Sequence, residues 1–328
     1  MKTAVYSIHR FEKEYLLQSN AGKHELQLIE SSLNEQTVVL ADGCSAISVF
    51  VNDEVSSKVL QRLQALGVHY IVLRSAGYNH VNLTELHRLG MKAARVPEYS
   101  PYSVAEHSVA LMLALNRKLI KANQRVDDLN FSLDGLEGFD MHGKTVGLIG
   151  TGKIGSVATK ILYGFGCNIL AFDKTENVAL CEQFGVRYTD CDTLCKESDI
   201  ITLHIPLVSE TKYIINKDCI DSMKSGVMLI NTSRGGLVNT VDVIEGLKSG
   251  KIKYFGMDVY EEEEHLFFED HSEDIPQDEV LARLMSFKNV LITGHQAFFT
   301  KEALQGIADT TIYNLDCFEK GIKSNHEL

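Results

Sequence analysis

The sequence predicts an α/β protein made of two doubly wound parallel-sheet domains. Its 328 residues are more than a single hydrophobic core usually serves, which favours two domains. Short apolar runs rich in β-branched residues alternate with segments of helical periodicity along the chain, as in parallel sheets covered by helices. A glycine-rich turn joins one such run to a helical segment near the middle of the chain.

The stretch from Lys144 to Asp173 is the most informative part of the sequence. The apolar run 145–149 predicts a buried strand, and the apolar residues that recur every three or four positions up to Phe165 predict a helix. A second apolar run, 168–172, ends at Asp173. Between the first strand and the helix, three glycines stand at G-x-G-x-x-G spacing: Gly150, Gly152 and Gly155.

This arrangement favours binding of a dinucleotide. Gly150 suits a tight turn, Gly152 lets a pyrophosphate approach the backbone, and Gly155 lets the helix pack close to the strand. Asp173 stands 18 residues after Gly155 (173 − 155), where a carboxylate accepts a ribose 2′-hydroxyl and repels a 2′-phosphate. We therefore expect NAD rather than NADP. The alternative is a glycine loop that closes an ordinary βα unit.

Composition excludes several other classes of function. The net charge is −12 and no basic stripe is present, so a nucleic-acid partner is not expected. No segment reads as a membrane span or a cleaved leader, which favours a cytoplasmic protein. The seven cysteines are odd in number and scattered, so we expect reduced thiols that mostly fill the core, and no metal site.

The first hundred residues show the alternation of a parallel sheet but lack a glycine fingerprint of their own. Strands are expected at 4–8, 25–29, 46–51, 70–73 and 91–96, and helices at 11–19 and 55–66. The loop 75–79 follows a strand at the edge where such sheets bind ligands. The proline-rich stretch 97–101 is the best domain break, and it precedes one long helix from Ser103 to about Asp128. Residues 130–142 resemble an arm that reaches a neighbouring subunit.

The second half predicts four strands whose carboxyl ends lie at one sheet edge. These strands are expected at 199–205, 227–231, 254–259 and 290–293. The polar residues at or just after their ends are His204, Arg234, Asp258 and His295. A charged, loop-rich excursion follows from 261 to 279, and a final helix at 303–320 is expected to return to the first domain.

These residue types suit the reduction of a keto acid beside a nicotinamide. A guanidinium such as that of Arg234 binds a carboxylate in bidentate fashion, and His295 is a natural proton donor near neutral pH. A carboxylate from the run 261–264 could orient that histidine, although spacing does not say which one. Other interpretations remain open at this point. Arg234 could cap a helix or contact a phosphate, His295 could be structural, and the glutamates could form a solvated surface.

The chain resembles the D-isomer-specific 2-hydroxyacid dehydrogenase family along nearly its whole length. The resemblance lies in five motifs: GTGKIG (150–155), LHIPL (203–207), NTSRGG (231–236), GMDVYEEE (256–263) and GH (294–295). Within that family it is most similar to the fermentative D-lactate dehydrogenases of bacteria. That closer match includes LRSAGYN (73–79), RVPEYSP (95–101), the arm 130–143, LFFED (266–270) and GHQAF (294–298). Gln296 replaces a hydrophobic residue that many members have, although the lactate enzymes share this glutamine.

The resemblance implies a Rossmann NAD-binding domain, 100–298, inserted into a flavodoxin-like substrate domain formed by 1–99 and 299–328. The catalytic residues that it implies are Arg234, Glu263 and His295. The cofactor-binding residues that it implies are Gly150, Gly152, Lys153, Ile154, Gly155, Asp173, His204, Ile205, Pro206, Thr211, Thr232, Ser233, Arg234, Asp258 and His295. The substrate-binding residues that it implies are Ala76, Gly77, Tyr78, Tyr99, Arg234, His295 and Phe298.

The expected activity is the reversible NADH-dependent reduction of pyruvate to D-lactate, with His295 as the proton donor. One alternative is a dehydrogenase for another 2-hydroxy acid, such as 2-hydroxyisocaproate or glycerate. The other is a non-catalytic NAD-sensing protein. By analogy with the family we expect a homodimer or a homotetramer.

Overall fold

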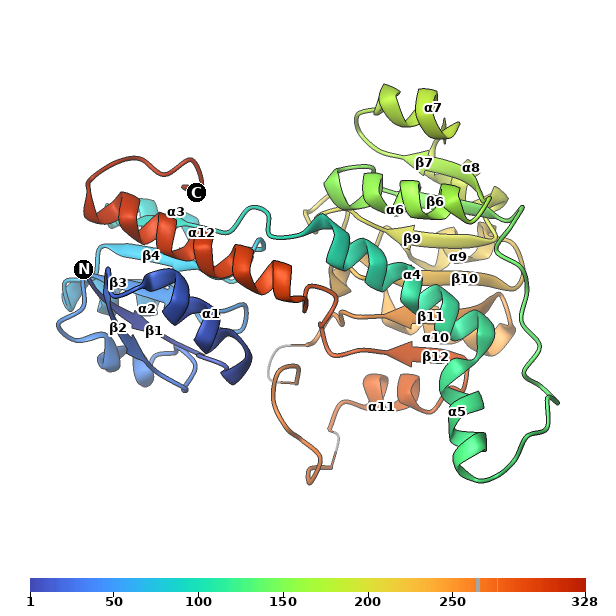
Figure 1. The fold of residues 1–328 in the computed structure, drawn as a ribbon, viewed down its shortest axis with the longest axis horizontal. Helices are drawn as coiled ribbons and strands as arrows, with labels where there is room; N and C mark the ends of the chain where they lie inside the picture. Colours follow the sequence, from blue (N-terminus) through green and yellow to red (C-terminus); the bar gives the residue numbers. More distant parts are fainter. Residues whose placement is uncertain (264–265, 276) are drawn as a thin grey trace. The chain divides into compact units, whose positions relative to one another are not determined.

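The computed structural model describes residues 1–263, 266–275 and 277–328, and these residues form two compact units. Met1–Ser100 and Phe299–Leu328 make up the first unit, and Pro101–Phe298 makes up the second. The chain therefore leaves the first unit once and returns to it near its C-terminal end (Figure 1).

The described part of the first unit contains a five-stranded, all-parallel sheet in the order β2-β1-β3-β4-β5. The strands are short; β1, β3 and β4 are mostly buried, whereas the edge strand β2 is partly exposed. Their bounds are β1 (Lys2–Val5), β2 (Glu25–Leu28), β3 (Ala46–Val49), β4 (Tyr70–Leu73) and β5 (Lys92–Ala94).

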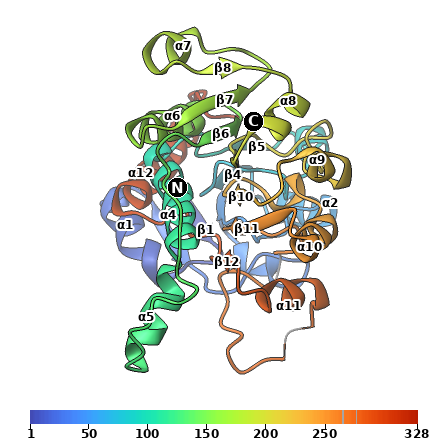
Figure 2. The same ribbon diagram turned by 90° about the vertical axis from the view of Figure 1, so that its right-hand side faces the viewer.

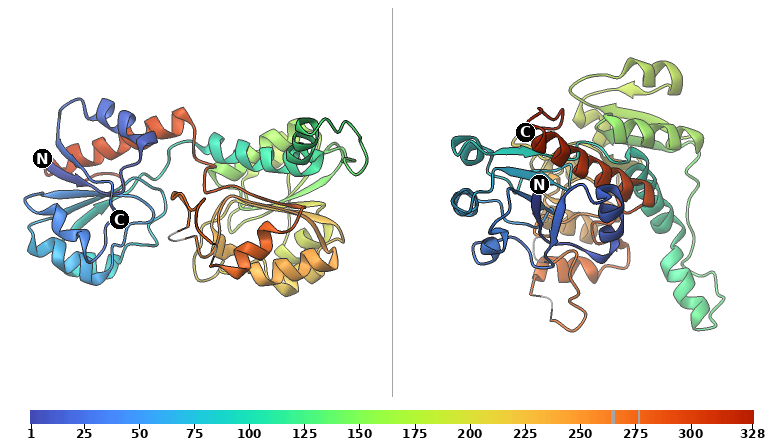
Figure 3. Two further views of the ribbon diagram at one scale, coloured as in Figure 1. Left: turned by 90° about the horizontal axis from the view of Figure 1, so that it is seen from below. Right: turned by 60° about the vertical axis from the view of Figure 1, so that its left-hand side comes forward.

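Helices cover both faces of this sheet. Figure 3 shows α1 (Arg10–Asn20) and α12 (Lys301–Glu319) on one face, and α2 (Ser57–Ala65) and α3 (Leu83–Arg88) on the other. A 3-10 helix, η1 (Thr37–Ala41), packs beside α2. The face under α1 and α12 is sealed by apolar side chains from both ends of the chain: Val5, Ile8, Leu16, Ile312, Leu315 and Phe318.

A buried ion pair links α1 to the sheet of the first unit. The Arg74 guanidinium donates to both carboxylate oxygens of Glu12, at 2.9 and 3.1 Å. It also donates to the hydroxyl of Ser48 and to the carbonyl of Tyr6. Since Arg74 is 2% and Glu12 5% exposed, this network satisfies charges that water cannot reach.

The described part of the second unit contains a seven-stranded, all-parallel sheet in the order β12-β11-β10-β9-β6-β7-β8. Together with the first sheet, it confirms the predicted fold class of two parallel-sheet domains covered by helices. The bounds are β6 (Thr145–Ile149), β7 (Asn168–Phe172), β8 (Arg187–Tyr188), β9 (Ile200–Leu203), β10 (Val227–Asn231), β11 (Ile252–Met257) and β12 (Val290–Ile292).

The helices of the second unit also lie on two faces. Figure 2 shows α4 (Pro101–Arg117) and α6 (Lys153–Gly164) on one side of the strands, and α8 (Cys191–Glu197), α9 (Lys217–Ser222) and α10 (Thr240–Ser249) on the other. The remaining elements are α5 (Leu119–Asp127), α7 (Val178–Phe184), η2 (Gly235–Leu237) and α11 (Glu279–Met285). No helix in the described residues is both long and apolar enough to cross a bilayer.

One sequence prediction is wrong in this unit. The single helix expected from Ser103 to about Asp128 is broken at Lys118, which adopts a left-handed backbone with φ of 51°. The break coincides with the return of residues 137–139 to the helix end. Lys118 Nζ donates to the carbonyl of Glu137, and the Asn116 side chain exchanges two hydrogen bonds with the backbone of Phe139. These hydrogen bonds to residues 137–139 stabilise the break and take the place of the backbone bonds that would continue the helix.

Candidate active site

Four adjacent strands of the second unit end at the same sheet edge. β9, β10, β11 and β12 are neighbours and run parallel, so their carboxyl ends lie side by side. Each strand is followed by one polar residue singled out in the sequence: His204, Arg234, Asp258 and His295. Topology therefore gathers residues that lie up to 91 positions apart (295 − 204).

His295 and Glu263 form a hydrogen-bonded pair at this edge. His295 Nδ1 lies 2.9 Å from Glu263 Oε1, and the two side chains are only 17% and 19% exposed. The other oxygen of Glu263 accepts a bond from the backbone N–H of Tyr260 at 3.0 Å. The carboxylate is thus fixed from behind, and it orients the imidazole with Nδ1 as the donor. Among the described residues, none forms a hydrogen bond with His295 Nε2, which leaves that nitrogen for a substrate oxygen.

Asp258 fixes the loop that bears His295. Its carboxylate is fully buried and accepts from the Thr293 hydroxyl at 2.5 Å and from the backbone N–H groups of Gln296 and Ala297 at 2.9 and 2.8 Å. The backbone N–H of His295 donates to the Asp258 carbonyl at 2.7 Å. Both carboxylate oxygens are therefore used by the chain itself. A direct contact between Asp258 and a cofactor stays a prediction.

Arg234 is half-buried and follows β10 in a loop with a fixed backbone. The Asn231 side chain donates to the Arg234 carbonyl at 2.9 Å, and the Ser233 hydroxyl donates to Leu203 at the end of β9. The next residue must be a glycine, because a Cβ on Gly235 would lie 2.0 Å from the backbone of Tyr260. One guanidinium nitrogen donates to the Ser233 carbonyl at 2.6 Å. Among the described residues no partner is found for the other guanidinium donors of Arg234, which can therefore bind an anion.

The glycine loop fits a dinucleotide pyrophosphate. A Cβ on Gly150 would lie 2.4 Å from the His204 carbonyl, and one on Gly155 would lie 2.1 Å from the Gly150 carbonyl. These two glycines are required by the close approach of the chain to itself. A Cβ on Gly152, at the N-terminus of α6, would meet nothing within 4 Å. The backbone at Gly152 is therefore open to a ligand, and α6 begins directly after it, at Lys153 and Ile154.

Asp173 ends β7 beside this loop and is held by Thr151 and Thr175. Its Oδ2 accepts from the backbone N–H of Thr151 at 2.6 Å and from the Thr151 hydroxyl at 3.1 Å. Burial raises the pKa of the Asp173 carboxyl, but hydrogen bonds from Thr151, Thr175 and Lys174 outweigh burial and leave the pKa below its usual value. The side chain is therefore an anion at neutral pH, which suits a ribose hydroxyl and repels a phosphate.

His204 follows β9 behind the glycine loop. Burial lowers the pKa of His204 to about 4, so the ring is neutral at physiological pH and is a poor proton donor. Its Nε2 lies 3.1 Å from the Thr202 hydroxyl. Downstream, the Thr211 hydroxyl donates to the carbonyl of Pro206 at 2.7 Å and fixes the loop that includes Ile205. Thr232, at the end of β10, is buried.

The predicted substrate residues Ala76, Gly77, Tyr78 and Tyr99 belong to the first unit. Arg95 donates to the Ala76 carbonyl at 2.7 Å, and its guanidinium lies 5.0 Å from the centre of the Tyr78 ring. The Ser75 hydroxyl closes the turn on the carbonyl of Gly77 at 2.7 Å. Contacts within the loop after β4 and from Arg95 therefore fix its conformation. At Tyr99, the backbone packs against α12, where a Cβ on Gly306 would lie 3.0 Å from its carbonyl oxygen.

Aromatic side chains surround His295 in the second unit. The ring centroid of Phe268 lies 5.6 Å from that of His295, and the centroid of Phe298 lies 6.5 Å from it. Sequence reasoning named Phe298 but gave Phe268 no role. The only available signal was the LFFED motif, because Phe268 lies 27 residues before His295 (295 − 268) in an irregular segment.

Comparison with known proteins gives one consistent result. Residues 109–297 match the model of the NAD-binding domain of D-isomer-specific 2-hydroxyacid dehydrogenases. The chain is 50% identical to a D-lactate dehydrogenase of Escherichia coli (strain K12), over the full length of both. The apo-structure of an E. coli D-lactate dehydrogenase superposes with a TM-score of 0.91, 48% identity and full coverage of both chains. The pyruvate reductase of Chlamydomonas reinhardtii superposes with a TM-score of 0.94 and 42% identity, covering 99% of this chain and 98% of the other.

The match of the family model covers more than half of the chain and includes the glycine loop, Asp173, Arg234, Glu263 and His295. Full-length relatives well above 30% identity agree with it. The protein belongs to the D-isomer-specific 2-hydroxyacid dehydrogenase family and has that family's NAD-binding domain.

Proposed function

We propose that this protein is a D-lactate dehydrogenase that reduces pyruvate with NADH and also runs in reverse. The observation on which the proposal rests is the pair of His295 and Glu263 at the same sheet edge as Arg234, in an NAD-binding unit. A family member with this pair has a proton donor and a carboxylate-binding cation for a 2-keto acid. The lactate and pyruvate enzymes named among its relatives support pyruvate as the substrate.

Arg234 holds the substrate in this proposal. Its guanidinium can bind the carboxylate of a keto acid in bidentate fashion and polarise the C2 carbonyl. Within the first unit, the backbone N–H groups of residues 76–78 stay predicted donors to a substrate carboxylate. Phe268 and Phe298 place apolar surface near His295 and favour a small apolar group such as the methyl of pyruvate.

His295 moves the proton. NADH, when bound, would supply the hydride for C2 of the keto acid. His295, protonated on both ring nitrogens, donates from Nε2 to the C2 oxygen while Nδ1 stays bonded to Glu263. The Glu263 carboxylate stabilises the charged ring before transfer, and Tyr260 keeps that carboxylate in position. In the oxidation of lactate, neutral His295 takes the proton back.

Residues of the second unit hold the cofactor in this proposal. The open backbone at Gly152 and the start of α6 at Lys153 and Ile154 receive the pyrophosphate, and Asp173 receives the adenosine ribose. The loops that contain Ile205, Thr211, Thr232 and Ser233 border the same edge. Asp258 contributes by fixing the loop after β12.

The test is an assay of His295→Gln with NADH and three keto acids: pyruvate, hydroxypyruvate and 2-ketoisocaproate. Removing the titrating group should lower pyruvate turnover by roughly 10²–10⁴-fold with little change in NADH binding. His69→Gln, an exposed histidine of the first unit, is the control and should keep full activity. Chiral analysis of the wild-type product should give D-lactate.

Three results would contradict parts of the proposal. Near-normal turnover by His295→Gln would remove the proton-transfer role. A preference of the wild type for a bulkier keto acid would keep the mechanism but change the substrate to a larger 2-hydroxy acid. Tight NADH binding without turnover of any keto acid would instead indicate an NAD-sensing protein.

We also infer that the protein works as a homo-oligomer through the arm that follows α5. The arm exposes three large apolar side chains, Leu129, Phe131 and Leu133, each at least 70% exposed. Acidic residues flank them at 127, 128, 134 and 137. Side chains of this kind on one projecting segment are typical of a subunit contact.

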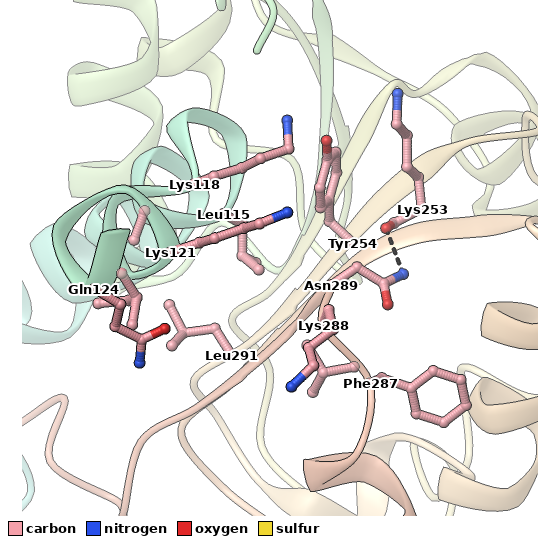
Figure 4. A pocket seen from close by; sticks show the side chains of 13 residues that line it. Leu115, Lys118, Lys121, Gln124, Lys253, Tyr254, Phe287, Lys288, Asn289 and Leu291 are labelled. Carbon is pink, nitrogen blue, oxygen red and sulfur yellow. Dashed lines mark hydrogen bonds between the residues drawn. The ribbon is translucent and has the colours of Figure 1, made fainter. Parts of the chain in front are cut away.

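A pocket in the second unit is complementary to this arm, because it is lined by apolar side chains and lysines. It measures about 680 Å³ and lies between the end of α4, α5 and the chain from 287 to 291 (Figure 4). Apolar side chains such as Leu115 and Leu291 form its floor, and its rim has four lysines, Lys118, Lys121, Lys253 and Lys288. No carboxylate in the described residues pairs with these lysines. The acidic, apolar arm of a second copy suits this surface.

Light scattering after size exclusion tests the inference. The wild type should elute as a dimer or a tetramer, and Phe131→Ser combined with Leu133→Ser should shift it toward the monomer. Val178→Ser, which changes an exposed apolar residue on α7, is the matched control and should leave the mass unchanged. A monomeric wild type would contradict the inference.

We expect the protein to act in the cytoplasm, where its seven unpaired cysteines, all within the described residues, stay reduced.

A further inference from the structure

Three cysteines of the second unit lie together, away from the strand ends of the candidate active site. Cys191 and Cys195 are one turn apart on α8, and Cys219 lies on the neighbouring helix α9. Cys195 Sγ lies 2.8 Å from Cys219 Sγ. That separation exceeds the S–S bond length of about 2.05 Å by less than an ångström. Cys191, four residues before Cys195 on the same helix, completes the cluster.

The members of this cluster differ in their access to solvent. Cys195 is 1% exposed and sits between the other two, whereas Cys191 and Cys219 are partly exposed. Within the described residues no three His, Cys, Asp or Glu side chains are arranged to hold a metal ion, so metal binding does not account for the cluster. The arrangement instead resembles an accessible thiol backed by a buried partner.

We propose that Cys219 and Cys195 form a redox-modification site that a peroxide converts reversibly into a disulfide. The Cys219 thiolate attacks one oxygen of hydrogen peroxide, which gives the Cys219 sulfenic acid and releases hydroxide. The Cys195 sulfur then attacks the Cys219 sulfur, forms the S–S bond and releases the sulfenic oxygen as water. Two thiols and one peroxide thus give one disulfide and two waters, and an external thiol reverses the change.

The order of attack follows from the environment of each sulfur. The hydrogen bond with Cys191 lowers the pKa of the Cys195 thiol, but the bond with Cys219 and burial outweigh it and raise that pKa to about 12. The hydrogen bond with Cys195, together with burial, raises the pKa of Cys191. Cys219 is partly exposed whereas Cys195 is buried, so a peroxide reaches Cys219 first and Cys195 is the resolving thiol. Since resolution needs a thiolate, disulfide formation should accelerate as the pH rises from 7 to 9.

The disulfide would close a chain segment that borders the cofactor edge. Residues 195–219 include the end of α8, strand β9, His204 and the loop fixed by Thr211. The bond would join α8 to α9, which lie on the side of the sheet opposite α4 and α6 (Figure 2). We therefore expect oxidation to rigidify the loop from 204 to 211 and to raise the thermal midpoint of the second unit by several degrees.

The experiment uses the purified full-length protein, treated with hydrogen peroxide, quenched with iodoacetamide in denaturant and mapped by mass spectrometry. Tryptic digestion should give the peptide 188–196 linked to the peptide 218–224, with two fewer alkylated thiols. Dithiothreitol should restore both. Cys219→Ser and Cys195→Ser should abolish the link. Cys191→Ser should retain it, and so should Cys181→Ser, a partly exposed cysteine on α7 that serves as the control.

Two outcomes would overturn the proposal. One is seven alkylated thiols in the wild type after peroxide treatment. The other is a link that persists in Cys195→Ser and disappears in Cys191→Ser, which would assign the disulfide to Cys191. The accompanying measurement is the thermal midpoint, which should rise on oxidation in the wild type and in Cys181→Ser but not in Cys219→Ser. Each readout is independent of catalytic turnover, so the result does not depend on the proposed substrate.

Discussion

At the scale of single residues, the glycine loop offers a matched pair of substitutions. A Cβ on Gly155 would lie 2.1 Å from a backbone oxygen, whereas one on Gly152 would meet nothing in the protein. Gly155→Ala should therefore destabilise the second unit by at least about 2 kcal/mol, because backbone must move. Gly152→Ala should change stability by less than about 1 kcal/mol but weaken NADH binding at least about tenfold, since the added methyl faces the pyrophosphate.

Urea unfolding and NADH fluorescence titration measure the two effects separately. We expect each variant to lose a different property. Gly155→Ala should have the lower unfolding free energy, and Gly152→Ala should have the weaker affinity for NADH. If Gly152→Ala bound NADH like the wild type, the pyrophosphate would have to lie elsewhere.

His204 gives a prediction about pH. Burial lowers the pKa of His204 to about 4, while the unfolded residue titrates near 6.5. Between these values the unfolded chain binds a proton that the folded one does not, so stability falls as the pH drops from about 6.5 to about 4. The loss from this residue amounts to at most about 3 kcal/mol. The measurement is the unfolding free energy as a function of pH. His204→Gln should make this free energy less dependent on pH between about 4 and 6.5, whereas His69→Gln should leave the dependence unchanged.

Some residues of the candidate site were predictable and others were not. Asp173, Arg234 and His295 follow strands, so their shared edge could be predicted from the alternation of strands and helices. The glutamate that pairs with His295 could not be found from spacing, because residues 261–263 form a turn that places one oxygen of Glu263 against Tyr260 N–H. The predicted run also included Glu264, which lies outside the described residues. The thiol cluster was equally hidden, since Cys195 and Cys219 meet only through the packing of two helices.

At the scale of elements, one buried ion pair adds to the apolar packing that attaches α1 to the first sheet. Glu12→Gln should leave the Arg74 guanidinium buried without its counter-charge and lower the unfolding free energy of the first unit by about 3–5 kcal/mol. Glu14→Gln, on the exposed side of the same helix, is the control and should cost less than about 0.5 kcal/mol. Equal stability of the two variants in urea would mean that Arg74 finds another partner.

The boundaries of some elements can be predicted from the sequence, whereas those of others cannot. Strand β10 begins and ends at the predicted residues, because a short apolar run leaves one register for a buried strand. The break at Lys118 was not predictable, since neither glycine nor proline marks it. It depends on bonds to Glu137 and Phe139, about twenty residues away in the chain, and local propensity contains no information about them.

At the scale of the whole molecule, the two units should respond separately to ligand. NADH at one hundred times its dissociation constant should stabilise the unit that binds it by about 2.7 kcal/mol. In calorimetry we expect two transitions, of which NADH raises only that of Pro101–Phe298, while Glu12→Gln lowers only the other. A single transition that shifts under both changes would show that the units unfold together.

The return of the chain to its first unit has a consequence for the order of synthesis. A ribosome completes residues 101–298 before it makes α12, so the second unit can close while the first still lacks a helix. Until residues 299–328 emerge, the apolar face formed by Val5, Ile8 and Leu16 has no cover from Ile312, Leu315 and Phe318. The first unit, although its larger part is made before the second unit, is therefore the later of the two to finish folding, and its apolar face stays open during that interval.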